Sequence, residues 1–195
     1  MPPRDKYVGL AKEDYYVTIG RMVPYKKMDL IVEAFGRMKD KRLVVAGAGP
    51  ELPRLKHLAR GHANVEILGF VDESRKLELL GKARAFVFAP HEDFGIAPLE
   101  AQGCGTPVIA YGKGGALETI VDGTTGVFFT EQTAESLREG LERFEKIETT
   151  FDPAVIREHA EQFSEEVFQQ RFRRIVEENI RCGAAPRRPV YQGGA

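Results

Sequence analysis

The sequence contains only two cysteines, Cys104 and Cys182, among its 195 residues. They form neither a Cys-x-x-Cys pair nor part of a framework of spaced cysteines. A small fold held together by disulfides is therefore excluded, and so is a zinc site built on paired cysteines. The shortage of cysteine favours a reduced, intracellular compartment.

An excess of charge of one sign is also missing, because 28 lysines and arginines are balanced by 29 aspartates and glutamates. A domain that binds nucleic acid would be expected to show a clear basic excess. The balance therefore argues against nucleic acid as a partner. Any site for a polyanion must be a local cluster of cations.

Long apolar runs do not occur either. No stretch is long enough to span a bilayer, and the first residues carry no apolar segment of the kind that a signal peptide needs. We therefore expect a cytoplasmic protein.

The chain does have enough apolar material for one core. With 43% hydrophobic residues, a chain of this length can bury a single sizeable core. We expect one domain over residues 1–182. Residues 183–195 are rich in small residues and proline, and we expect them to form a disordered tail.

Short apolar runs alternate with longer segments of helical period, which is typical of a parallel sheet covered by helices on both faces. Strands are predicted at residues 15–19, 42–46, 65–68, 85–88, 107–110 and 126–128. Helices are predicted between them, at residues 28–38, 52–60, 73–82, 96–103 and 115–121. Further helices are predicted after the last strand, at residues 133–144, 153–162 and 164–181. The fold class is therefore α/β, with a doubly wound, Rossmann-like sheet of about six parallel strands followed by C-terminal helices.

In such a sheet, ligands bind beyond the carboxyl ends of the strands, so functional residues are expected in the loops that follow them. The first of these loops contains Gly20, Arg21 and Lys26. Arginine can bind a phosphate through two parallel hydrogen bonds, and lysine adds a mobile positive charge. The two cations would suit a diphosphate, although a solvated basic turn explains the loop equally well.

The second loop starts as a dinucleotide-binding fingerprint would, with Gly47 and Gly49. The fingerprint fails, however, because Leu52 occupies the position of its third glycine. A tight turn between strand and helix is the favoured explanation of both glycines, which we keep as secondary site residues together with Gly20.

The third loop consists of Gly69, Phe70 and Val71. A glycine followed by an aromatic and an apolar residue at the end of a strand could form the wall of a nucleobase site. Packing of Phe70 in the core is the alternative explanation.

The fourth loop carries the strongest signal. Glu92 follows the fourth predicted strand, and the next helix is predicted to begin at Ile96. The backbone amides of Gly95, Ile96 and Ala97 would then be free at a helix N-terminus, where they could bind a phosphate. Glu100 lies about one turn further along, so both carboxylates would stand at the same opening. Either glutamate alone would be ordinary, because acids are common near helix N-termini.

His91 precedes Glu92, but a lone histidine at the end of a strand is more often a structural group, so it is a secondary candidate. The sequence contains no Asp-x-Asp pair and no cluster of histidine and cysteine with the spacing of metal ligands. We therefore expect neither a metal nor another cofactor.

Together these motifs resemble the C-terminal domain of the family-four retaining glycosyltransferases, which have two facing Rossmann-like domains. The resemblance covers most of the chain. Its markers are Gly20-Arg21 with Lys26, Gly47-Ala48-Gly49-Pro50, Gly69-Phe70, the E-x7-E motif from Glu92 to Glu100, Gly105-Thr106-Pro107-Val108-Ile109, Gly114-Gly115 with Glu118, and Asp122-Gly123-Thr124-Thr125-Gly126.

The resemblance implies a role for each loop in binding a nucleotide-sugar donor. Glu92 would contact the transferred sugar and is the catalytic candidate, and Glu100 would bind the ribose hydroxyls. The implied diphosphate-binding residues are Arg21, Lys26, Gly95, Ile96 and Ala97. The implied sugar-binding residues are Glu92, Asp93, Phe94 and Gly95.

The resemblance further implies a metal-independent hexosyltransferase that retains the anomeric configuration. The sequence around Glu92 looks most like that of bacterial mannosyltransferases of polysaccharide assembly. The expected reaction is therefore mannosyl transfer from GDP-mannose to a glycan or lipid-linked acceptor. The acceptor would be held by an N-terminal domain that this chain is expected to lack, and the complete enzyme could associate peripherally with a membrane. Two alternatives stay open, namely an inactive nucleotide-sugar-binding module or split-enzyme subunit, and a nucleotide-sugar epimerase.

Overall fold

The computed structural model describes residues 5–181. The chain forms two compact units, Met1–Glu161 and Gln162–Ala195, and each is described by itself. The predicted disordered tail, residues 183–195, lies outside the described residues. The predicted extent of the domain, residues 1–182, stays a prediction.

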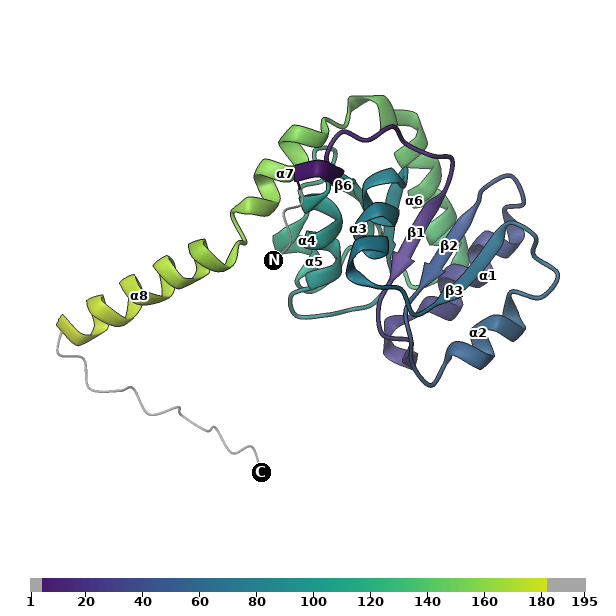
Figure 1. Cartoon of the computed structure of the whole chain (residues 1–195), viewed down its shortest axis with the longest axis horizontal. Coiled ribbons are helices and arrows are strands. Elements are labelled where there is room, and N and C mark those ends of the chain that lie inside the picture. Colours follow the sequence, from purple (N-terminus) through teal and green to yellow (C-terminus); the bar gives the residue numbers. More distant parts are fainter. Residues whose placement is uncertain (1–4, 182–195) are drawn as a thin grey trace. The chain divides into compact units, whose positions relative to one another are not determined.

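The first unit is built on one parallel sheet (Figure 1). Its strands are β1 (Tyr16–Ile19), β2 (Leu43–Ala46), β3 (Val65–Gly69), β4 (Ala85–Phe88), β5 (Val108–Tyr111) and β6 (Gly126–Phe129). They are arranged in the order β3-β2-β1-β4-β5-β6, and every neighbouring pair is parallel. The order of the strands reverses between β1 and β4. The prediction of a doubly wound, Rossmann-like sheet is confirmed.

Helices cover both faces of this sheet. One face packs against α1 (Met28–Arg37), α2 (Leu52–Leu58) and α6 (Ala134–Ile147). The other packs against α3 (Glu73–Lys82), α4 (Ile96–Gly103) and α5 (Ala116–Thr119). The first unit also contains α7 (Pro153–Glu161) and the short 3-10 helices η1 (Asp5–Tyr7), η2 (Pro24–Lys26) and η3 (Glu148–Thr150).

Alternation along the strands produces the two cores. Tyr16 of β1 and Val45 of β2 belong to the core under α1, α2 and α6, whereas Val17 and Val44 belong to the opposite core. Successive side chains of a strand point to opposite faces, so an uninterrupted apolar strand serves both layers at once. This is why β2, β4 and β5 are apolar at successive positions and not at every second position only.

Most element ends agree with the sequence prediction to within one residue, and three helices differ by more. The helix predicted at residues 52–60 ends at Leu58 in α2. The helix predicted at residues 115–121 is limited to α5 (Ala116–Thr119), because Ile120 adopts extended dihedral angles of φ −127° and ψ 133°. The helix predicted to stop at residue 144 continues to Ile147 in α6. Its last turn is held by Glu145, which accepts hydrogen bonds from Lys41 Nζ at 2.6 Å and from the Tyr16 hydroxyl at 2.8 Å.

Glycines allow the loops after β1, β2 and β3 to pack backbone against backbone. The amide of Gly20 donates to the Ala46 carbonyl at 3.1 Å, and the amide of Gly47 donates to the Gly69 carbonyl at 2.7 Å. A Cβ atom on Gly47 would lie 1.9 Å from the Gly20 oxygen, and one on Gly49 would lie 2.3 Å from the Met22 oxygen. The close approach of neighbouring loops therefore accounts for these two glycines.

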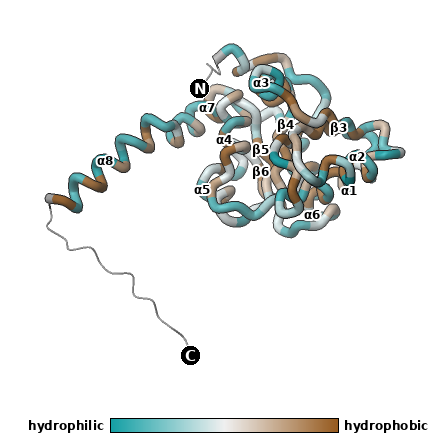
Figure 2. Tube along the Cα trace, turned by 60° about the horizontal axis from the view of Figure 1, so that its bottom comes forward, coloured by the Kyte–Doolittle hydropathy of each residue, from teal (hydrophilic) through white to brown (hydrophobic). Residues whose placement is uncertain are grey.

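The second unit contains α8 (Glu165–Arg181). Its first turn is capped by Ser164, whose hydroxyl accepts a hydrogen bond from the Val167 amide at 3.3 Å, as an N-cap residue does. Apolar residues recur at helical spacing, and the rings of Phe168 and Phe172 stack at a centroid distance of 6.0 Å. Figure 2 shows the resulting alternation of apolar and polar segments along α8.

No helix within residues 5–181 has both the length and the apolar character required to cross a bilayer.

Candidate functional site

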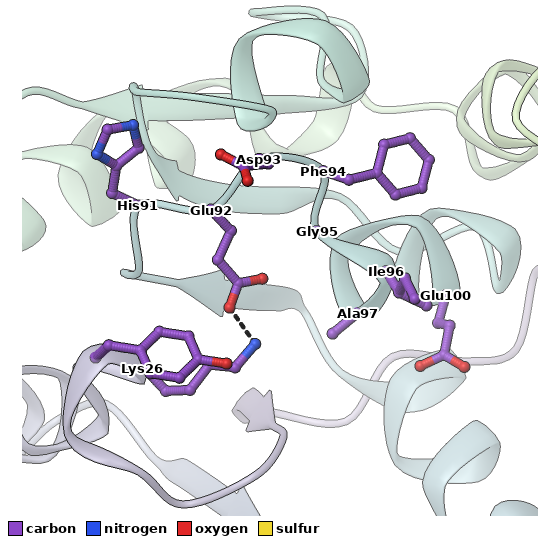
Figure 3. A pocket seen from close by; sticks show the side chains of 10 residues that line it. Lys26, His91, Glu92, Asp93, Phe94, Gly95, Ile96, Ala97 and Glu100 are labelled. Carbon is purple, nitrogen blue, oxygen red and sulfur yellow. Dashed lines mark hydrogen bonds and ion pairs between the residues drawn. The ribbon is translucent and has the colours of Figure 1, made fainter.

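A cavity of about 600 Å³ lies at the carboxyl ends of β1 and β4. The strand order reverses at this point, which is where doubly wound sheets bind their ligands. Its volume is in the range of small-molecule sites. The lining residues are Tyr25, Lys26, His91, Glu92, Asp93, Phe94, Gly95, Ile96, Ala97 and Glu100 (Figure 3).

Gly95 lets α4 begin directly at the cavity. Its φ of +83° lies in the left-handed region that favours glycine, and the helix starts at the next residue. No side chain caps this N-terminus. The amides of Ile96 and Ala97, in the first turn, have no carbonyl of a preceding turn to bond to, so they present donors and a partial positive charge to the cavity.

Lys26 and Glu92 form an ion pair across the cavity (Figure 3). Their side chains are 20% and 18% exposed. Lys26 is the last residue of η2, and the following Lys27 closes that turn with a left-handed φ of +54°. The cation predicted to bind a diphosphate and the carboxylate predicted to bind a sugar are therefore each other's partners in this structure.

Glu100 forms a second lysine–carboxylate pair at the cavity. Lys76 Nζ of α3 donates to Glu100 Oε1 at 2.8 Å. Lys76 was not predicted as a site residue, because a lysine on an amphipathic helix carries no sequence signal of its own. Contact with Glu100 depends on how α3 packs beside α4, which only the tertiary structure shows.

The backbone around Glu92 is held by a pair of glycines in the loop after β5. The amide of Gly115 donates to the Glu92 carbonyl at 2.7 Å. A Cβ atom on Gly115 would lie 2.3 Å from the Asp93 oxygen, and one on Gly114 would lie 2.4 Å from the Glu92 oxygen. Glycine is therefore needed for the two loops to approach this closely, and the carbonyl contact fixes where Glu92 leaves the backbone.

The structure brings nine of the predicted site residues to the cavity and leaves seven outside its lining. Those at the cavity are Lys26, His91, Glu92, Asp93, Phe94, Gly95, Ile96, Ala97 and Glu100. Those outside the lining are Gly20, Arg21, Gly47, Gly49, Gly69, Phe70 and Val71.

Two residues outside the lining are exposed at the carboxyl end of the sheet. Arg21 is exposed in the same loop as Lys26. Phe70 is 79% exposed, so the alternative explanation that it packs in the core is wrong.

Tyr25 lines the cavity and was not predicted as a site residue. Its side chain is 58% exposed, and Lys26 Nζ lies 5.2 Å from the centre of its ring. An exposed aromatic next to a predicted phosphate-binding lysine was the signal that could have identified it.

Within residues 5–181, no three histidine, cysteine, aspartate or glutamate side chains are grouped so that they could hold a metal ion.

Comparison with known proteins agrees with the fold. The sequence model of the family described as "Glycosyl transferases group 1" matches residues 4–170. This chain belongs to that family. The matched range contains all six strands, the loops that follow them and the segment from Glu92 to Glu100.

Curated relatives of this glycosyltransferase chain are longer than the chain itself. It is 36% identical over 138 residues to a GDP-mannose-dependent alpha-(1-6)-phosphatidylinositol monomannoside mannosyltransferase of Mycolicibacterium smegmatis, covering 63% of this chain and 36% of the relative. It is 33% identical over 150 residues to a D-inositol 3-phosphate glycosyltransferase of Kribbella flavida, covering 67% of this chain and 35% of the relative. The glycosyltransferase chain thus spans about a third of the length of these relatives.

Solved structures confirm the fold. The apo form of a lipopolysaccharide outer core galactosyltransferase, WaaB, superposes with a TM-score of 0.74 at 17% identity, covering 88% of this chain and 51% of that one. The pneumococcal O-GlcNAc transferase GtfA, solved with UDP and GlcNAc, superposes with a TM-score of 0.70 at 21% identity, covering 87% of this chain and 36% of that one.

Proposed function

We propose that this chain is the donor-binding part of a retaining, metal-independent hexosyltransferase. The proposed reaction is transfer of a mannosyl group from GDP-mannose to a glycan or lipid-linked acceptor. The acceptor-binding part lies in sequence outside this chain. A cytoplasmic location, with peripheral membrane association of the complete enzyme, belongs to the same proposal.

The observation that carries the proposal is the single cavity shared by Lys26, the first amides of α4, Glu92 and Glu100. A nucleotide sugar needs a cationic site for its diphosphate, flanked by acceptors for the hydroxyls of a sugar and of a ribose. The cavity offers a lysine and helix amides for the first need, and two carboxylates for the second.

The same residues suit the chemistry of transfer. Negative charge grows on the diphosphate as the bond to the sugar breaks, so donors placed around it stabilise the transition state more than the ground state. In this proposal, Lys26 and the amides of Ile96 and Ala97 supply that stabilisation, and Arg21 joins them from the same loop as Lys26. Glu92 orients the sugar and stabilises the positive charge that develops on it.

The mannosyl donor is supported by the Mycolicibacterium smegmatis relative, which is named as a GDP-mannose-dependent enzyme. That name also describes a lipid acceptor, a phosphatidylinositol monomannoside. Several other relatives are named D-inositol 3-phosphate glycosyltransferases. Structural relatives were solved with UDP, so the nucleobase is the part of the proposal that needs the most direct test.

Calorimetric titration of the full chain with GDP, UDP and ADP tests the donor-binding proposal. We expect one nucleoside diphosphate to bind, with GDP preferred, and the affinity to be the same with and without a chelator of divalent cations. If none of the three binds, the donor-binding proposal is wrong. If a chelator abolishes binding, the metal-independent site is wrong, and a preference for UDP or ADP overturns the assignment of GDP-mannose.

Replacing Gly115 by alanine is expected to weaken binding of GDP-mannose by about ten-fold, because the new Cβ atom would push the loop that carries Glu92 away from the cavity. Calorimetry and a fold check by circular dichroism measure the effect. Gly112→Ala is the matched control in the same loop, since a Cβ atom there would lie 3.3 Å from its nearest neighbour, Phe128 Cβ. Equal affinities for both variants would contradict the positioning of Glu92 by Gly115.

A further inference from the structure

Lys76 touches a cavity residue without lining the cavity itself. Its ammonium donates to Glu100 Oε1 at 2.8 Å, and Glu100 is among the lining residues whereas Lys76 is not. Glu100 is therefore the lining residue through whose carboxylate Lys76 can influence how a ligand is positioned.

The position of Lys76 is well determined by the start of α3. Asp72 caps the helix, its carboxylate accepting from the Arg75 amide at 2.7 Å, and the Lys76 amide donates to the Asp72 carbonyl at 2.9 Å. A side-chain cap of this kind stabilises the first turn of a helix. Lys76 is consequently held by the backbone at the point from which it reaches α4.

The pair between Lys76 and Glu100 is largely shielded from water, with side chains 19% and 16% exposed. Lys76 also contacts Glu73 Oε2 at 2.8 Å, but that carboxylate is 49% exposed. Burial alone would lower the pKa of Lys76, yet the hydrogen bonds to Glu100 and Glu73 outweigh burial and leave that pKa raised. The ammonium therefore stays charged at neutral pH. Its hydrogen bond to Glu100, the more buried partner, is stronger than that to Glu73.

We propose that Lys76 is a positioning residue for the ribose: it fixes the orientation of the Glu100 carboxylate, and so sets how strongly the site discriminates a ribose from a sugar without vicinal hydroxyls. This rests on the proposed function, in which Glu100 accepts hydrogen bonds from ribose hydroxyls. Without Lys76, the Glu100 side chain keeps its charge but loses a contact that restricts its rotamer. A hydrogen bond to a charged group is directional, so discrimination suffers more than overall affinity.

A purely structural role for Lys76 would give a different result. Lys82, six residues further along α3, also pairs with carboxylates, donating to Glu78 Oε1 at 2.9 Å and lying 3.2 Å from Glu13 Oε1. Neither partner lines the cavity. If lysine–carboxylate pairs only stabilise α3, removal of Lys82 and removal of Lys76 should have equal effects on the ligand.

The test compares affinities of the full chain for two ligands by calorimetry. The first ligand is whichever of GDP, UDP and ADP binds most tightly, and the second is its 2′,3′-dideoxy counterpart. We expect the unaltered chain to prefer the ribonucleotide by about ten-fold, the effect of a hydrogen bond to a charged acceptor. Lys76→Met is expected to reduce this preference to about two-fold, whereas Lys76→Arg and Lys82→Met should keep it.

The outcomes separate the two proposals. If the unaltered chain binds no nucleoside diphosphate, the proposed function fails. If it binds and prefers the ribonucleotide, but Lys76→Met keeps that preference or Lys82→Met loses it equally, the role of Lys76 is overturned. Lys76→Leu replaces Lys76→Met if the latter does not fold, and an unchanged preference there overturns the proposal in the same way.

Discussion

Replacing Lys26 by methionine is expected to weaken binding of a nucleoside diphosphate by about ten-fold or more, because a charge-assisted hydrogen bond to phosphate is lost. Replacing Glu92 by glutamine is expected to tighten the same binding by about three- to five-fold. In the structure the two side chains are paired, so a diphosphate must compete with Glu92 for Lys26. The pair is about as shielded from water as that of Lys76 and Glu100, and a net cost of about 1 kcal/mol to separate it sets the size of the gain.

The two substitutions therefore have opposite signs, and calorimetry with GDP, UDP and ADP measures both. Lys56→Met on α2 controls for the loss of positive charge, since Lys56 is exposed and does not line the cavity. For the sugar conjugate, Glu92→Gln should gain less than for the diphosphate alone, because the sugar then lacks its carboxylate. Weakening of diphosphate binding by Glu92→Gln would show that Glu92 is not its competitor.

Replacing Gly47 by alanine is expected to lower the free energy of unfolding by about 3 kcal/mol or more. Two costs combine at this position. The φ of Gly47 is +134°, outside the regions that a residue with a side chain tolerates, and the new Cβ atom would lie 1.9 Å from the Gly20 oxygen. The atom that the Cβ atom would meet belongs to the backbone, so no change of a side-chain rotamer can relieve the overlap. It can be relieved only if the two loops move apart and lose their contact.

Urea unfolding of Gly47→Ala and Gly61→Ala separates the two costs. Gly61 also has a positive φ, +87°, but a Cβ atom there would meet nothing within 4 Å. Its substitution should therefore cost only the strain of the backbone, about 1–2 kcal/mol. Equal losses for both variants would mean that the packing of the Gly20 and Gly47 loops contributes nothing to stability.

The elements of the fold could be predicted from local patterns. The strand at residues 85–88 and the helices at residues 73–82 and 96–103 were predicted with the bounds that the structure has. Apolar runs, caps and glycines act over a few residues, so a sequence displays them directly. The end that was missed in α6 depends on longer-range contacts, those of Glu145 with Lys41 and Tyr16.

The site was predicted less completely. Nine residues of the cavity were identified, from their place after a strand or from the family resemblance, since the parallel topology brings the carboxyl ends of strands to one edge. Tyr25 and Lys76 were not. Arg21, Phe70 and the glycines of the second loop do not line the cavity, and their proposed contacts with a donor stay predictions.

The sequence by itself determined the alternation of strands and helices, the parallel sheet and the glycine that starts α4 at the cavity, because each follows from residues close together in the chain. Only the tertiary structure decided which charges meet. Lys26 and Glu92 are 66 residues apart, and Lys76 and Glu100 are 24 apart. Their pairing depends on β1 lying beside β4 and on α3 packing near α4, and that arrangement results from burial of the whole sheet rather than from any local pattern.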